Sequence, residues 1–168
     1  YAPLNVYGQT KLEGELAVSN TLEKYFIVRI AWVFGLNGNN FIKTMLNVGK
    51  KYPVLRVVND QIGTPTYTLD LSRLLVDMVQ SEKYGYYHAT NEGGYISWYD
   101  FACQIAENCG NYNCTILPCH SDEFPSPVKR PSYSVLDKTK IKETFGVRIP
   151  YWAYSLQLCI NHLKKRKK

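Results

Sequence analysis

The sequence predicts an α/β fold, and two observations near its start carry that prediction. Pro3 and Asn5 are helix-entry signals, and leucines at 12, 16 and 22 give the segment after them an apolar stripe. Residues 25–35 then form an almost unbroken apolar run that ends at a glycine, which is typical of a parallel strand buried on both faces. In such a fold the ligand lies beyond the carboxyl ends of the strands, here near Trp32.

Helices and strands continue to alternate along the rest of the chain. Gly49 and Gly146 are predicted helix ends, and Ser97 with Asp100 predicts a capping box. Polar or proline-rich loops are expected at 37–40, 60–66 and 121–131. Apolar periodicity predicts strands at 53–58, 85–90 and 115–117, and helices at 41–48, after residue 66 (with Leu71, Leu74, Leu75, Met78 and Val79 facing the core), at 97–108, 138–145 and 151–165.

Tyr7 and Lys11 are the candidate catalytic residues. They are four residues apart in a predicted helix, so their side chains share one face. An ammonium group close to a phenol favours the phenolate, which moves the phenol toward general acid or base catalysis at a carbonyl or alcohol. A tyrosine and a lysine at this spacing are common in helices without any catalytic role, so the pattern needs its surroundings to be specific.

Four blocks of sequence supply those surroundings. They are residues 5–15 (NVYGQTKLEGE), 29–35 (RIAWVFG), 60–67 (DQIGTPTY) and 130–137 (RPSYSVLD). In this order they resemble the dTDP-4-dehydrorhamnose reductase family of extended short-chain dehydrogenases/reductases. The similarity covers the second half of such an enzyme. Family members begin with a glycine-rich βαβ unit, and no G-x-G-x-x-G run follows a predicted strand here. We therefore expect the carboxyl-terminal portion of a reductase.

The resemblance implies how the chain is divided. Residues 1–36 correspond to the end of a Rossmann-like NAD(P)-binding domain, with its catalytic helix and following strand. Residues 37–163 correspond mainly to a small α+β substrate-binding domain, with some elements returning to the main sheet. Residues 164–168 form a basic tail. The incomplete sheet exposes an edge, which favours formation of a homo-oligomer.

The resemblance also implies roles for individual residues. Tyr7 protonates the developing alkoxide, and Tyr7, Lys11 and Ala31 contact the cofactor. The implied substrate-binding residues are Trp32 on the deoxysugar ring, Asn40 and Arg130 on the diphosphate, and Gln61. From spacing alone, a core tryptophan, a turn glutamine and a solvated arginine are the ordinary interpretations.

The implied reaction is hydride transfer from NADPH or NADH to C4 of a dTDP-4-keto-6-deoxy-L-sugar, in dTDP-L-rhamnose biosynthesis for cell wall polysaccharide. This chain alone is expected to be inactive, because most of the dinucleotide site is missing. Three alternatives stay open. One is a nucleotide-sugar epimerase or dehydratase, which shares Tyr7 and Lys11. The others are a regulatory subunit related to the methionine adenosyltransferase β subunit and a stand-alone nucleotide-sugar-binding module.

The amino-acid composition narrows the class of protein further. The 168 residues are 45% hydrophobic, enough for one sizeable core, and contain neither a membrane-length apolar stretch nor a signal-peptide pattern. The net charge of +6 comes largely from residues 164–168, which lack interleaved aromatic residues, so no nucleic-acid or membrane partner is expected. Five cysteines without a C-x-x-C pair indicate reduced thiols in a cytoplasmic protein and no metal site.

Overall fold

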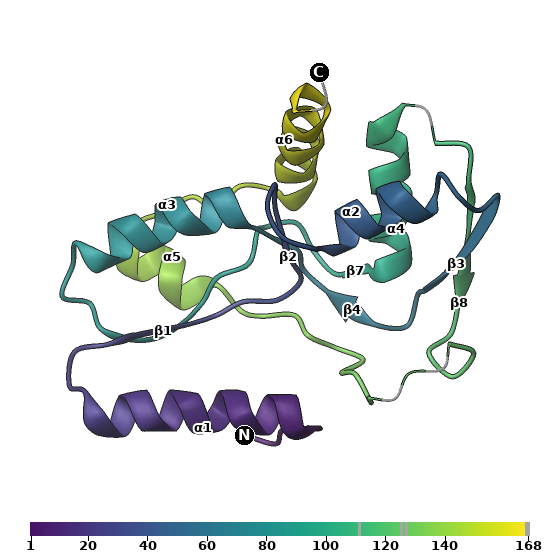
Figure 1. The fold of residues 1–168 in the computed structure, drawn as a ribbon. Helices are drawn as coiled ribbons and strands as arrows, with labels where there is room; N and C mark the ends of the chain where they lie inside the picture. The colour runs from purple at the N-terminus through teal and green to yellow at the C-terminus, as the bar shows by residue number, and fades with distance from the viewer. Residues whose placement is uncertain (111, 125, 127, 167–168) are drawn as a thin grey trace.

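The structure is a computed structural model that describes residues 1–110, 112–124, 126 and 128–166. Its helices and strands alternate along most of the chain (Figure 1). The helices are α1 (Val6–Thr21), α2 (Phe41–Val48), α3 (Thr68–Val79), α4 (Trp98–Cys109), α5 (Thr139–Phe145) and α6 (Trp152–Lys165). The strands are β1 (Phe26–Arg29), β2 (Val33–Phe34), β3 (Val54–Val58), β4 (Ile62–Gly63), β5 (Thr66–Tyr67), β6 (Gly85–His88), β7 (Ile96–Ser97) and β8 (Thr115–Cys119).

The strands pair two by two, and most pairs are parallel. The parallel pairs are β1 with β6, β2 with β5, and β3 with β8, whereas β4 and β7 are antiparallel. In the β3–β8 pair Val54 lies opposite Thr115 and Val58 opposite Cys119. Both strands therefore end at the same edge, where the α/β rule places a ligand.

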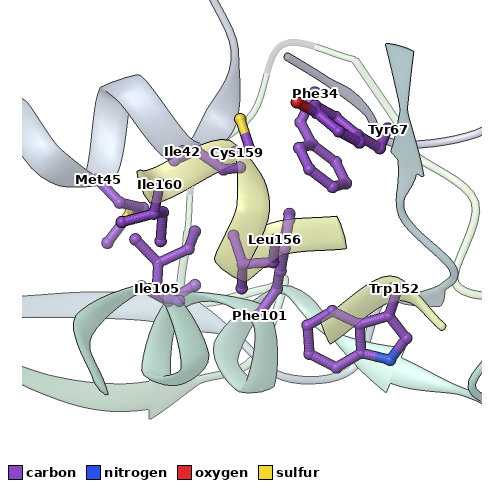
Figure 2. Packing of buried hydrophobic residues seen from close by; sticks show 12 residues of the cluster. Phe34, Ile42, Met45, Tyr67, Phe101, Ile105, Trp152, Leu156, Cys159 and Ile160 are labelled. Carbon is purple, nitrogen blue, oxygen red and sulfur yellow. The ribbon is translucent and has the colours of Figure 1, made fainter. Parts of the chain in front are cut away.

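Two hydrophobic clusters hold the described residues together. In the larger one, side chains of α6 lie between those of α2 and α4, and the Phe34 and Tyr67 rings stack beside them (Figure 2). The smaller cluster contains Met78, Tyr87 and Ile141, so it joins α3, β6 and α5. The helix α1 belongs to neither cluster. It lies below β1 in Figure 1 and has no buried residue.

The expected strand at 25–35 is wrong as a single element. The chain forms β1 beside β6, turns at Trp32, and then forms β2 beside β5. Trp32 has a φ of 49°, a left-handed conformation that is strained for a bulky side chain. The strand is also half-buried rather than buried on both faces. An unbroken apolar run does not show where a strand changes its partner, so this turn could not be predicted from the run.

The other elements lie close to their expected positions. Ser97 and Asp100 form the predicted capping box, and Gly146 ends α5 in a left-handed conformation. Some details differ: the expected loop at 60–66 contains β4 and leads into β5, the short strand β7 precedes α4 where none was expected, and Val79 is 67% exposed instead of facing the core. Lys164 and Lys165 form the exposed last turn of α6, while Lys167 and Lys168 lie outside the described residues. No described helix has both the length and the apolar character to cross a bilayer.

Candidate functional site

A cleft of about 1000 Å³ opens at the carboxyl ends of β3 and β8. We call it the β3–β8 cleft. Its apolar walls come from α2, β3 and α4, and its polar walls come from the loops that follow β3 and β8 and from residues 129–132. The lining side chains include Phe41, Met45, Leu55, Val57, Trp98, Arg56, Asp60, Gln61, Ser121, Phe124, Lys129, Arg130 and Ser132.

Hydrogen bonds join the two loops that close the end of the cleft. The Asn59 amide donates to the Cys119 carbonyl oxygen over 2.9 Å, which extends the strand pairing by one residue. Asp60 accepts hydrogen bonds from the Ser121 hydroxyl at 2.6 Å and from the Ser121 amide at 3.0 and 3.1 Å. These bonds, the hydroxyl one above all, hold the pKa of Asp60 below its usual range. The Asp60 carboxylate is therefore ionised at neutral pH.

The same wall is secured by a second charged group. Glu123 accepts a hydrogen bond from the His120 amide at 2.9 Å and forms a salt bridge with Arg56. The amide first, and then the guanidinium, hold the pKa of Glu123 below its usual range. Because Arg56 lies on β3 and Glu123 follows β8, this salt bridge also links β3 to the loop after β8.

Aromatic rings form the opposite side. Trp98 lines the cleft, stacks on Trp32 with ring centroids 3.8 Å apart, and contacts Phe41 at 4.6 Å. The indole of Trp32 fits only because residue 63 is glycine: a Cβ there would lie 2.5 Å from Trp32 Cε2. The turn at Trp32 thus directs its ring into this stack. Aromatic walls of this kind suit a planar base or the apolar face of a sugar.

Cations lie at the mouth of the cleft. Lys129 and Arg130 are exposed, and within the described part of the chain neither forms a salt bridge. An unpaired guanidinium can bind a phosphate through two parallel hydrogen bonds. The combination of aromatic walls with free cations fits a nucleoside diphosphate better than a neutral metabolite.

The other residues implied by the resemblance surround the cleft without all entering it. Gln61 and Arg130 line it, but Trp32 supports the lining residue Trp98 from behind. Asn40 is the N-cap of α2, and its amide is occupied: Oδ1 accepts from the Lys43 amide at 3.2 Å, and Nδ2 donates to the Gly35 carbonyl at 2.8 Å. The Ala31 carbonyl oxygen accepts from the Thr66 hydroxyl.

Tyr7 and Lys11 lie on α1, outside the β3–β8 cleft. Lys11 Nζ is 5.5 Å from the centroid of the Tyr7 ring, so the two side chains do share a helix face. Tyr7 is 70% exposed, and Lys11 lines a separate hollow of about 210 Å³ beside Arg29. The N-cap residue of α1 contacts the cleft: Asn5 Nδ2 donates to the Lys129 carbonyl oxygen over 3.1 Å. The chain thus brings the pair together but does not place it in one cavity with Arg130.

Comparison with known proteins decides the family. A family model described as the RmlD substrate binding domain matches residues 1–165. The chain belongs to this family. It is 39% identical to a dTDP-4-dehydrorhamnose reductase of Aggregatibacter actinomycetemcomitans, over 92% of this chain and 56% of that protein. The chain therefore spans little more than half the length of the curated relatives that it matches.

Solved structures of RmlD-family proteins share its fold. A dTDP-4-dehydrorhamnose reductase of Clostridium acetobutylicum ATCC 824 is 44% identical with a TM-score of 0.92, covering 97% of this chain and 57% of that one. The Bacillus anthracis str. Ames protein of the same name, solved in complex with NADP, is 37% identical with a TM-score of 0.91, covering 96% and 57%. The predicted α/β class and the predicted resemblance are confirmed.

Three residues of this RmlD-family cleft went unnoticed in the sequence. Ser121 bridges the two loops, Arg56 on β3 forms a salt bridge with Glu123 in the loop after β8, and Trp98 forms the aromatic wall. A usable signal existed for Ser121, because it follows a predicted strand in the same way as Asp60 does, and parallel strands end at one edge. Trp98 is the first residue of α4, and nothing in its sequence surroundings distinguishes it from a core aromatic residue.

Proposed function

We propose that this chain is the portion of a dTDP-4-dehydrorhamnose reductase that binds the nucleotide sugar and supplies the proton donor. Its family, and relatives of this name at 37 to 44% identity, support the reaction class. The reaction is reduction of the C4 ketone of a dTDP-4-keto-6-deoxy-L-sugar in dTDP-L-rhamnose biosynthesis. The substrate, the activity and the roles below are parts of this proposal.

The observation that carries the proposal is the β3–β8 cleft itself. Its volume of about 1000 Å³ accommodates a nucleoside diphosphate, and its aromatic wall offers Trp98 to a base. Arg130 and Lys129 at the mouth supply positive charge for the two phosphates. The sugar then extends toward α1. The N-cap residue of that helix, Asn5, donates a hydrogen bond to the Lys129 carbonyl oxygen beside the cleft.

Tyr7 and Lys11 perform the chemistry. When bound, a nicotinamide cofactor supplies a hydride to the C4 carbon. The Tyr7 hydroxyl donates its proton to the C4 oxygen as negative charge develops there, and the Lys11 ammonium stabilises the resulting phenolate. Exposure of both groups on one face of α1 leaves them accessible to a substrate and a cofactor from outside this chain's own core.

The chain's residues suit one end of such a cofactor. Tyr7 and Lys11 present hydrogen-bond donors to ribose hydroxyls. The Gly93–Gly94 turn does not offer a phosphate cradle, because a Cβ on Gly93 would lie 2.2 Å from the Tyr151 ring, and that ring occupies the space. A complete dinucleotide site is therefore expected only with the further length that the relatives have.

Two measurements test the proposal, one on this chain and one on a chimera. Calorimetry on the 168-residue chain should show dTDP binding and little NADPH binding. A chimera with the amino-terminal part of the Clostridium acetobutylicum relative placed before Tyr1 should oxidise NADPH when given the 4-keto sugar. A chimera that binds both ligands without turnover would favour the regulatory-subunit alternative, and a chain that binds no nucleotide would refute the assigned cleft.

A further inference from the structure

Asp60, Ser121 and Gln61 form a chain of hydrogen bonds inside the β3–β8 cleft. Ser121 Oγ donates to Asp60 Oδ1 over 2.6 Å, and Gln61 Nε2 donates to Ser121 Oγ over 3.0 Å. The residues come from two loops, 60 positions apart, which the β3–β8 pairing brings to one edge. All three line the cleft.

The direction of this chain of bonds follows from the number of protons available. An ionised carboxylate can only accept hydrogen bonds, and a serine hydroxyl has a single proton to donate. The short bond to Asp60 uses that proton, and bonds to an ionised acceptor are the stronger kind. The Ser121 oxygen can therefore only accept from Gln61.

This constraint fixes how the Gln61 amide is turned. If its carbonyl oxygen faced Ser121, two oxygens would meet without a proton between them. The amide nitrogen must face Ser121, and the carbonyl oxygen, Oε1, is left over. No donor within the described residues reaches Oε1, although Gln61 lines the cleft.

We propose that Asp60 and Ser121 are positioning residues that hold Gln61 Oε1 as a hydrogen-bond acceptor for a donor group of the bound nucleotide. The inference rests on the proposed function, which places a pyrimidine nucleoside diphosphate in the cleft. Such a ligand carries two neutral donors of this kind, the N3–H of the thymine ring and the 3′-hydroxyl of the deoxyribose. A base with an acceptor at the same position is disfavoured, because two lone pairs would then face each other.

Calorimetry with three nucleotides distinguishes the two donors. The probes are dTDP, N3-methyl-dTDP and 3′-deoxy-dTDP, and the proteins are the full 168-residue chain and its variants. In the wild-type chain, the analogue that lacks the donor for Gln61 should bind about 10-fold more weakly than dTDP, the usual effect of leaving one polar group unpaired. The other analogue should bind nearly as well as dTDP.

The variants show whether Ser121 and Asp60 act through Gln61. In Ser121→Ala the 10-fold preference should fall to about 2-fold or less, because the amide can then turn either way. Ser121→Thr, which keeps the hydroxyl, should restore it. Asp60→Asn should also reduce it, because an asparagine can donate to Ser121 and release the hydroxyl proton toward Gln61. The matched control is Ser72→Ala, an exposed serine on α3 that does not line the cleft, which should keep the full preference.

The outcomes separate this inference from the function on which it rests. If dTDP binds but Ser121→Ala and Asp60→Asn keep the full preference, or if the wild type shows none, the positioning role is overturned and the binding cleft stands. If dTDP does not bind at all, both fall. Melting temperatures confirm that each variant is folded. If Ser121→Ala does not fold, the isosteric Asp60→Asn variant carries the test.

Discussion

The edge of the β3–β8 pair and the face of α1 carry the two halves of the proposed site, and they are built differently. Around the cleft, Asp60, Ser121, Arg56 and Glu123 are held by hydrogen bonds and a salt bridge within the chain. On α1, Tyr7 is 70% exposed and its close neighbour is Lys11, one turn away. The binding half is therefore preorganised by this chain, whereas the catalytic half is displayed on a helix that contributes nothing to either core.

The largest effect is expected from Tyr7→Phe in the chimera, which should change catalysis without changing nucleotide binding. Loss of the general acid should lower turnover by about 10²-fold or more and leave dTDP affinity unchanged, because the hydroxyl lies outside the cleft. Stopped-flow or steady-state NADPH oxidation measures turnover. Tyr52→Phe, another exposed tyrosine, is the control. A near-normal rate in Tyr7→Phe would remove Tyr7 from the mechanism.

Arg130→Ala should do the opposite. It should weaken dTDP binding by about 10-fold or more, since a charge-assisted contact to phosphate is lost, and it should leave thymidine binding unchanged. Calorimetry with the two ligands measures the difference. Arg148→Ala is a matched control, because Arg148 is exposed but lines another cavity. Equal losses for dTDP and thymidine would mean that Arg130 does not contact the diphosphate.

Alanine substitutions at two glycines, one beside the cleft and one on α1, should change the stability of the protein in opposite directions. Gly63→Ala should lower the free energy of unfolding by about 1–3 kcal/mol, because its Cβ would collide with a Trp32 ring that Trp98 already holds. Gly14→Ala on α1 should raise it by about 0.5–1 kcal/mol, since nothing lies within 4 Å of a Cβ there and alanine favours a helix. Urea unfolding measures both. The same sign for both changes would contradict the packing described.

A smaller effect on the free energy of unfolding is expected when the pH is lowered. The pKa of Asp60 is lowered in the folded protein, chiefly by the Ser121 hydroxyl, so its ionised form contributes stability above the ordinary aspartate pKa of about 3.9. That contribution should disappear as the pH falls through the lowered value. The free-energy difference between wild type and Asp60→Asn should therefore be constant above about pH 5 and shrink below pH 4.

Urea unfolding at several pH values measures that difference. Glu123, whose pKa is also lowered, keeps its salt bridge with Arg56 in both proteins, so its titration largely cancels. A free-energy difference that does not change down to pH 3 would show that the ionised form of Asp60 does not stabilise the folded protein.

Local features were accessible from the sequence, and long-range ones were not. The Tyr7–Lys11 neighbourhood follows from helical spacing, and the Ser97–Asp100 capping box follows from residues three positions apart. The order of the predicted strands could have placed Ser121 near the same sheet edge as Asp60. Its hydrogen bond with Gln61 could not be predicted, because that bond depends on the register of β3 against β8, two strands about 60 residues apart in the chain. The turn at Trp32 was missed for the same reason: it marks a change of strand partner, which an apolar run does not record.

The most direct test of the central claim is an amide NMR titration of the labelled 168-residue chain with dTDP. The preorganised cleft predicts saturable shifts at Gln61, Ser121 and Arg130, with little change along α1 around Tyr7. Shifts confined to α1, or none at saturating dTDP, would contradict it.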